Sequence, residues 1–365
     1  MKLEIHKDKL KEIVGVLRSS LSKGGIEPIY EHLLFEIKDK VLTVKSTDTK
    51  MATVFYCSID NEDNFSFSLH GGTLSSVLAS LDEDIVNLEY DSKTNDIKLT
   101  CGKYNLDSSS GDTLDFPTIS IPKSLKVVKL PETFTTMLKS VSFSIGEDIT
   151  KKDLNSLCMD INKDNSGRLS LISTDRIRLS YSSILIDETD TTRFIIPLNS
   201  VKEIEKFEPT HMMYGPEKQR IYFTKETSLG TFIFQTVLTN AVYPDIYTYL
   251  TEDFGEGKII KMKRRDIIRV LKRVGLTSDK LNKCGTIDFN NGHLILSALS
   301  ASSKSKEEID IESPDGTPNS FSINIGYVMD YLNQETRDEV DIKVINNSCL
   351  VFDKENYRHV LAVNS

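Results

Sequence analysis

Three basic stretches carry the residues best suited to chemistry in this sequence, and that chemistry is the attraction of phosphate groups. Lys258 to Arg273 contains eight basic residues against Asp266, a net charge of +7. Lys2 to Lys23 and Lys123 to Lys139 each carry a net charge of +3. The whole chain of 365 residues has a net charge of −9, so the remainder sums to −22. A local basic stripe, rather than the average charge, decides whether a surface attracts phosphates.

The same stretches have the apolar spacing of amphipathic helices. In the first stretch the apolar positions are Leu10, Ile13, Val14 and Leu17, and the basic positions on another face are Lys7, Lys11 and Arg18. In the third stretch the apolar positions are Ile267, Ile268, Leu271 and Val274, and the basic positions opposite them are Arg265, Arg269 and Lys272. One basic helix face is usually only a solvated face. Three of them in comparable places favour a binding surface.

Catalytic and metal-binding patterns are weak by comparison. Ser173-Thr174-Asp175 could be half of a catalytic site, but the same triplet at Ser46-Thr47-Asp48 has no histidine in register, which favours a tight polar turn. The stretch 160–171 resembles a calcium loop in its first acidic positions, yet it lacks the glycine at position 6 and the glutamate at position 12. The sequence has no HExxH, P-loop, GxGxxG or GxSxG motif. We therefore expect no catalytic residues, no metal, no cofactor and no enzymatic activity.

An internal repeat positions the basic helices. Val41 to Asp48 (VLTVKSTD) recurs 127 residues later within Arg168 to Leu179, and a looser copy begins at His293. Phe65–Leu69 matches Phe194–Ile196 and Phe321–Ile323 at the same spacing, and Phe116-Pro117 matches Tyr243-Pro244. A period this long means that each copy is a domain. We predict three similar domains, at residues 1–127, 128–257 and 258–365.

Each predicted domain is of the α+β class, with two helices and about eight short strands. The basic helix comes first, strand-like runs with polar turns follow, and a second helix is expected at 73–81, 200–207 and 327–333. The connections lie at 115–126 and 243–257, where X-Pro steps favour extended backbone. The five scattered cysteines, the charged N-terminus and the lack of an apolar run of 18 residues predict free thiols and a cytoplasmic protein with no membrane partner.

With these features the chain resembles the bacterial DNA polymerase III β subunit family, the sliding clamps. The resemblance covers the whole chain, and its specificity comes from the number, order and spacing of the repeats together. Local matches agree with it: Thr174-Asp175 before Arg178-Leu179, the corners at Asp115-Phe116-Pro117 and Tyr243-Pro244-Asp245, and Ile325 to Leu332.

The resemblance implies a head-to-tail homodimer that forms a six-domain ring around duplex DNA, independently of its sequence. The implied partners are the DNA polymerase, the clamp loader and other proteins with a clamp-binding motif. The basic residues expected to face DNA are Lys7, Lys11, Arg18, Lys23, Lys139, Lys202, Arg265, Arg269, Lys272 and Arg273.

Partner proteins of this family dock a short peptide in a groove between domains two and three. Carried over by position, the groove residues here are Thr174, Arg176, Arg178, Leu179, Pro244, Tyr249, Leu281, Val360, Leu361 and Val363. The chain departs from the family pattern at four places: Arg176 replaces a small glycine, Ile177 an aromatic or imidazole residue, Thr248 an arginine, and Leu361-Ala362-Val363 a Met-Pro-Met tail. A divergent or virus-encoded clamp with its own polymerase would show such changes.

The family closes its ring with apolar contacts between domains one and three, and the corresponding residues are Tyr104 and Leu106 against Leu276. Two alternatives stay open at this point. One is a three-domain scaffold that binds proteins or nucleic acid without encircling it. The other is a hydrolase or nuclease, which requires a carboxylate or histidine cluster found in one repeat and absent from the others.

Overall fold

The computed structural model describes residues 1–22, 24, 27–251, 257–279, 283–290, 292–311, 320–345 and 348–363. These residues form two compact units. Unit 1 contains Met1–Glu132 and Lys202–Leu238, and unit 2 contains Thr133–Val201 and Thr239–Ser365.

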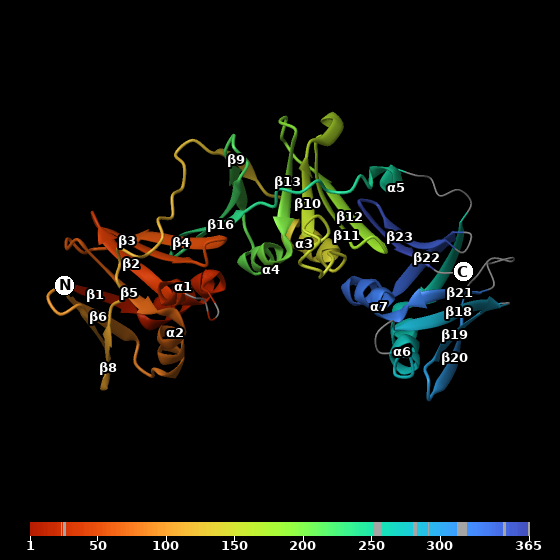
Figure 1. Ribbon diagram of the computed structural model, residues 1–365, viewed down its shortest axis with the longest axis horizontal. Helices are drawn as coiled ribbons and strands as arrows, with labels where there is room; N and C mark the ends of the chain where they lie inside the picture. The colour runs from red at the N-terminus through yellow and green to blue at the C-terminus, as the bar shows by residue number, and fades with distance from the viewer. Residues whose placement is uncertain are drawn as a thin grey trace. The chain divides into compact units, whose positions relative to one another are not determined.

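Three similar sets of elements follow one another along the chain, each with eight strands and two principal helices in the described residues (Figure 1). The first set is β1 (Lys2–His6), α1 (Lys7–Leu17), β2 (His32–Lys38), β3 (Val41–Thr47), β4 (Met51–Ser58), β5 (Phe65–His70), α2 (Gly71–Ser80), β6 (Ile85–Asp91), β7 (Asp96–Cys101) and β8 (Tyr104–Ser109). The second set is β9 (Lys126–Lys129), α3 (Phe134–Ser142), β10 (Ser156–Ile161), β11 (Arg168–Thr174), β12 (Arg178–Leu185), β13 (Thr192–Pro197), α4 (Leu198–Phe207), β14 (His211–Tyr214), β15 (Arg220–Thr227) and β16 (Gly230–Val237).

After a short helix, α5 (Tyr247–Thr251), the third set repeats the order. It consists of β17 (Lys258–Lys263), α6 (Arg264–Gly275), β18 (Cys284–Asn290), β19 (His293–Leu299), β20 (Lys304–Asp310), β21 (Ser320–Asn324), α7 (Ile325–Gln334), β22 (Glu339–Ile345), β23 (Cys349–Lys354) and β24 (Tyr357–Ala362). Single 3-10 turns lie at Arg18–Ser20, Pro28–Glu31 and Lys163–Asn165. The predicted α+β content of each repeat is confirmed.

All strands pair antiparallel, and two of the four sheets join strands of different repeats. Unit 1 has a four-stranded sheet, β1-β6-β7-β8, and an eight-stranded sheet, β5-β2-β3-β4-β16-β15-β14-β9. Unit 2 has an eight-stranded sheet, β13-β10-β11-β12-β24-β23-β22-β17, and a four-stranded sheet, β20-β19-β18-β21. The strands of the second repeat are therefore divided between the units, because each half of them hydrogen-bonds to a different neighbour.

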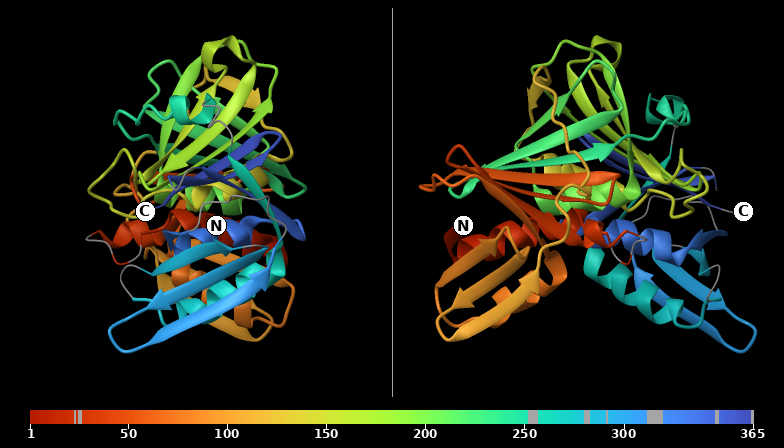
Figure 2. Two further views of the ribbon diagram at one scale, coloured as in Figure 1. Left: turned by 90° about the vertical axis from the view of Figure 1, so that its right-hand side faces the viewer. Right: turned by 60° about the vertical axis from the view of Figure 1, so that its left-hand side comes forward.

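The first helix of each repeat forms where the sequence predicted it, with the apolar stripe against the sheets. In α1 the buried residues are Leu10, Ile13, Val14 and Leu17, and in α6 they are Ile267, Val270, Leu271 and Val274. Helix α1 packs on α2, β1 and β4, and α6 packs on α7 and on β17 to β20 (Figure 2). Burial of the stripe leaves the basic side of each helix facing solvent.

The repeated Ser-Thr-Asp triplet is a turn that ties a strand to the first helix. The Oγ of Ser46 donates to the carbonyl of Leu17 at 2.8 Å, and the Oγ of Ser173 donates to the carbonyl of Val141. The aspartate, Asp48 or Asp175, accepts two backbone N–H groups of the turn through Oδ1. The serine and aspartate side chains of both triplets thus serve as hydrogen-bonding groups of a turn. This confirms the interpretation of the triplet as a polar turn.

A buried carboxylate closes the C-terminal end of α7. Glu335 accepts hydrogen bonds from the Arg337 guanidinium at 3.0 Å, the Lys354 ammonium at 3.0 Å and the Tyr331 hydroxyl at 2.9 Å. Burial alone would raise its pKa, but these hydrogen bonds and those from the backbone outweigh burial and lower the pKa to about 2. Glu335 is thus an ionised group built into the third domain's core.

Candidate interfaces for nucleic acid and partner proteins

The basic residues predicted to face DNA are mostly exposed on the first helices. Exposed positions are Lys11, Arg18, Lys139, Lys202, Arg265, Arg269, Lys272 and Arg273. Lys7 is different, because its ammonium lies 3.4 Å from the carbonyl of Leu81 and 3.6 Å from Asp84, and its side chain is only 16% exposed. Lys7 therefore holds α1 to the segment after α2. Lys23 lies outside the described residues.

The guanidinium groups of α6 sit beside carboxylates that orient them. Asp266 lies 3.3 Å from Arg269, and Glu307 of β20 lies 2.9 Å from Arg273. The arginine side chains are nevertheless 54% and 63% exposed. Exposed ion pairs of this kind contribute little stability, so a phosphate can replace the carboxylate at small cost.

An apolar cluster on one face of the large sheet in unit 2 forms the floor of the predicted peptide groove. It comprises Cys158, Ile172, Leu179, Ile195, Tyr243, Ile246, Ile345, Cys349, Val351 and Val360, with Tyr181, Tyr247 and Leu250 packed against it. Tyr243 and Ile246 come from the connection after β16, which crosses this face. The Tyr243 hydroxyl donates to the carbonyl of Ile172 at 3.2 Å, and burial raises its pKa well above the ordinary value.

The connection between domains two and three is fixed by polar contacts at its far end. Asp160 is 2% exposed and accepts two hydrogen bonds from Arg193, at 2.7 and 2.8 Å, and one from the Tyr247 hydroxyl. The Lys163 ammonium lies 2.9 Å from the centre of the Tyr247 ring, a cation–π contact. Because Asp160 is used in this way, the stretch that resembles a calcium loop serves to hold the connection in place.

The predicted groove residues fall on two faces of the sheet. Leu179 of β12 and Val360 of β24 are directly opposite each other and belong to the apolar cluster. Their chain neighbours Arg178 and Leu361 are also paired, but Leu361 belongs to the core of the third domain. Successive residues of a strand point to opposite faces, so Arg178 and Leu361 lie on the face of the sheet opposite to the predicted groove.

Arg178 is a buried guanidinium that ties the second domain to the third. Its Nε lies 3.0 Å from Asp175 and its Nη1 lies 2.6 Å from Asp330 of α7. Its charged group also lies 4.1 Å from the centre of the Tyr327 ring. A buried guanidinium with two carboxylate partners and an aromatic face is fully compensated. Arg178 therefore holds the position of the turn that rims the groove.

The remaining predicted groove residues take up different positions. Thr174 is buried and donates to the carbonyl of Arg178, while Arg176, at φ 78°, projects a side chain that is 69% exposed and 3.7 Å from Asp153. Tyr249 is 51% exposed and Pro244 is half-buried. Val363 packs against the core of the third domain. Leu281 lies outside the described residues.

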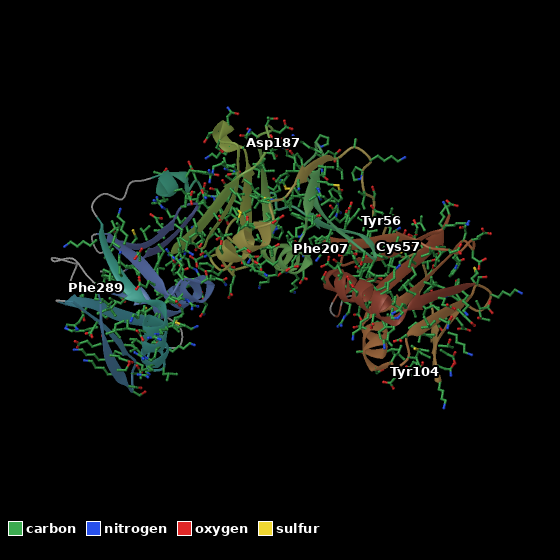
Figure 3. All side chains as sticks on the ribbon, turned by 180° about the vertical axis from the view of Figure 1, so that it is seen from behind. Tyr56, Cys57, Tyr104, Asp187, Phe207 and Phe289 are labelled. Atoms are coloured by element: carbon green, nitrogen blue, oxygen red, sulfur yellow. The ribbon has the colours of Figure 1, made fainter. Side chains whose placement is uncertain are left out.

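The predicted ring-closing residues lie at free edges and ends. Tyr104, which is labelled in Figure 3, and Leu106 belong to β8, the edge strand of the small sheet of unit 1. Leu276 follows α6 and is 86% exposed. β20, the edge strand of the small sheet of unit 2, is not among the residues predicted from the sequence to close the ring. No local sequence pattern marks β20 as an edge; its status follows only from the pairing of the other strands.

Histidine and carboxylate groups in the described residues show no arrangement that would hold a metal ion. His359 is fully buried, its Nδ1 lies 2.8 Å from Ser180, and burial lowers its pKa to about 3. Because neither side of this Ser–His pair reaches solvent, a substrate has no access to it.

Among the described residues no helix is long and apolar enough to cross a membrane.

Three tandem α+β domains, joined by sheets that continue from one domain to the next and carrying basic first helices, define the DNA-clamp class of fold. The chain belongs to the DNA polymerase III beta subunit family. Models of the N-terminal, central and C-terminal domains of that subunit match residues 1–120, 130–245 and 255–362. The sliding-clamp function expected from the sequence is thereby confirmed.

Characterised relatives are distant but extend over most of the chain. The beta sliding clamp of Chlamydia pneumoniae is 22% identical over 306 residues, which is 82% of this chain and 80% of that protein. The beta sliding clamp of Pseudomonas putida is 20% identical over 347 residues, 93% of this chain and 92% of that protein. The crystal structure of the DNA polymerase III subunit beta from Pseudomonas aeruginosa has a TM-score of 0.89 at 18% identity, covering 100% of this chain and 99% of that one.

Proposed function

We propose that two copies of this chain close head to tail into a six-domain ring around duplex DNA and tether the replicative polymerase to it. The observation that carries the proposal is the set of unpaired sheet edges. The first and fifth strands of every repeat are edges: β1, β9 and β17, and β5, β13 and β21. The fourth strand instead pairs with the eighth strand of the next repeat, β4 with β16 and β12 with β24. In the described residues this leaves β20 and β8 as the fourth and eighth strands without a partner.

A second copy satisfies both edges at once. Its β8 pairs with β20 of the first copy, and its β20 pairs with the first copy's β8, which closes a ring with two identical junctions. Unpaired edges are otherwise sites of uncontrolled association. A heterologous contact whose rotation closes gives a ring rather than a fibre.

An internal junction also gives the register of this pairing. Ala52 lies opposite Gln235 in one junction, and Leu179 lies opposite Val360 in the other. The junction of domains two and three is transferred here, with the β7–β8 and β23–β24 hairpins aligned at their two-residue turns, so that Tyr104 is equivalent to Tyr357. Lys304 lies opposite Asp107, and Ser305 lies opposite Leu106.

This register matches charge with charge and apolar surface with apolar surface. On the exposed face, Asp107 meets Lys304 and Lys103 meets Glu308, two pairs of opposite sign. On the other face, half-buried Leu106 is brought toward the end of α6, where Leu276 is 86% exposed. Opposite charges directly across a strand pair are favourable and like charges are not.

The exposed lysines and arginines of the first helices supply the attraction to DNA. They stand on helix faces with few aromatic neighbours, so they attract phosphates without reading bases. A ring held in this way stays on the duplex while it moves along it. The polymerase, the clamp loader and other partners dock a peptide in the apolar groove of unit 2, which converts repeated rebinding into an intramolecular event. The proposed domain limits are 1–127, 128–257 and 258–365.

Disulfide trapping tests the ring and its register together. In a Cys284→Ser background, Asp107→Cys with Lys304→Cys is expected to give covalent dimers that stay on nicked circular DNA at high salt and leave it when the DNA is cut to a linear form. The matched control is Asp107→Cys with Glu308→Cys, which places the thiols four residues apart in register. Trapped dimers that are not retained on circular DNA would favour the scaffold that binds without encircling.

A further inference from the structure

The junction between domains one and two contains a cleft that the clamp function described above does not use. Its volume is about 460 Å³, and it lies between the connection 118–125 and the hairpin of β14 and β15. All of its lining residues belong to unit 1. Volumes of this size are typical of sites that take a ligand or a peptide segment.

One residue that lines this cleft carries a buried, unpartnered acceptor. Gln235 lines it and is only 5% exposed. Its Oε1 has no hydrogen-bond partner among the described residues. Buried polar atoms are nearly always paired, and leaving one unpaired costs stability. A group that donates a hydrogen bond would satisfy this acceptor.

The internal repeat shows what kind of position this is. Gln235 lies opposite Ala52 across the junction of domains one and two, as Val360 lies opposite Leu179 across the junction of domains two and three. Tyr222, the neighbour of Gln235 on β15, corresponds to Val351 on β23, the neighbour of Val360. The same place in the fold is thus apolar in one junction and polar in the other.

The charges of the cleft favour an acidic occupant. Arg220 and Lys218 line it together with Glu217. No ion pair joins Arg220 to another residue in the described part of the chain. Burial raises the pKa of the Tyr222 hydroxyl, and the nearby charge of Arg220 partly opposes that rise. A carboxylate between Arg220 and Gln235 would receive charge-assisted hydrogen bonds from the guanidinium.

The connection along the cleft is suited to an extended partner. Ile121-Pro122 and Phe116-Pro117 favour extended backbone, and in the described structure no backbone–backbone hydrogen bond involves residues 118–125. An extended backbone with unpaired groups can accept a further strand.

We propose that this cleft is a second docking site, which binds an extended acidic peptide segment of a partner protein. A carboxylate of the peptide meets Arg220, and an N–H or O–H group donates to Gln235 Oε1. This proposal rests on the proposed function in one respect. It takes the groove of unit 2 to be a peptide site, and it takes this cleft to be the equivalent site in unit 1. Two sites of different polarity would let one ring hold two kinds of partner at the same time.

The test is selection of peptides on the intact protein. A displayed library of random heptapeptides is panned on the immobilised full-length chain, and each enriched peptide is made with a fluorophore and titrated by anisotropy. We expect one class rich in Asp and Glu, whose affinity falls at least ten-fold with Arg220→Glu and with Gln235→Leu. Tyr249→Ala, at the other groove, is the matched control and leaves the affinity of this class unchanged.

The proposal is overturned if no acidic class is enriched, or if the acidic peptides bind both variants as tightly as the unaltered chain. Thermal unfolding of each variant shows whether the fold is kept, and Arg220→Ala serves if Gln235→Leu does not fold. Retention on circular DNA is measured with the same variants and is expected to be unchanged. Loss of rings in the unaltered protein would instead count against the proposed clamp assembly, independently of peptide binding.

Discussion

Reversing one charge at the β8 edge tests the proposed ring at both of its junctions. Asp107→Lys replaces an attractive pair with Lys304 by a repulsive one. Cross-strand charge pairs are worth about 0.5 kcal/mol in either direction, so the change costs about 1 kcal/mol at each junction. The ring has two identical junctions and the cost is counted twice, about 2 kcal/mol, which weakens the dimer roughly 30-fold.

The assay is the dimer dissociation constant from sedimentation equilibrium over a dilution series. Lys304→Asp alone is expected to weaken the dimer as much as Asp107→Lys, and the two together are expected to restore it. Asp60→Lys, an exposed charge reversal in the same unit away from β8, is the control. Because the groups are exposed, the effect should shrink at about 1 M salt, where the screening length is about 3 Å.

The outcomes separate three possibilities. A dimer that tolerates Asp107→Lys would refute the pairing of β8 with β20. Recovery by Lys306→Asp in place of Lys304→Asp would keep the ring but move the register by two residues. If neither Lys304→Asp nor Lys306→Asp restores the dimer while Asp107→Lys alone still weakens it, Asp107 acts within its own subunit.

Three further predictions concern DNA, partner docking and stability. Arg265→Glu with Arg269→Glu should weaken retention on DNA and leave the dimer intact. The slope of log K against log salt concentration should become shallower by about 0.9 for each phosphate that is no longer neutralised, and an unchanged slope would count against the basic-helix model. Tyr249→Ala should reduce polymerase stimulation and leave DNA retention unchanged, and full stimulation would contradict the groove assignment. Glu335→Gln should lower the free energy of unfolding at pH 7 by up to about 3 kcal/mol, as measured in urea. The folded-state pKa of about 2 lies below the ordinary 4.5, so this difference should be complete above pH 4.5 and disappear as the pH falls toward 2; a difference that does not vary with pH would refute it.

The sequence predicted those parts of the fold that depend on local patterns. The apolar stripes of α1 and α6 follow directly from helical periodicity, and the second helices form within two residues of the predicted starts at 73, 200 and 327. The Ser-Thr-Asp turns were also predictable, because the repeat showed the triplet twice without a catalytic partner. Short-range hydrogen bonds and single-helix burial decide all of these features.

Long-range pairing had no local signal. Nothing in the residues of β4 or β12 states that each continues into a strand of the next repeat, and therefore nothing marked β20 as the unmatched edge. The groove prediction was limited in a different way. It took Arg178 with Leu179, and Val360 with Leu361, although neighbours on a strand face opposite sides. Period-two alternation would have separated the groove floor from the groups that support it.

The two junctions within the chain show how one framework can acquire different binding properties. Both place a fourth strand against an eighth strand and lay a connection with an X-Pro step across the same face. Backbone pairing fixes that geometry and does not depend on the side chains on this face of the sheet. Those side chains are consequently free to differ, Leu179 and Val360 in one junction, Ala52 and Gln235 in the other. In such an architecture, a few positions on this face of the sheet would set the specificity of each proposed docking site, and substitution there should alter partner choice without disturbing the ring.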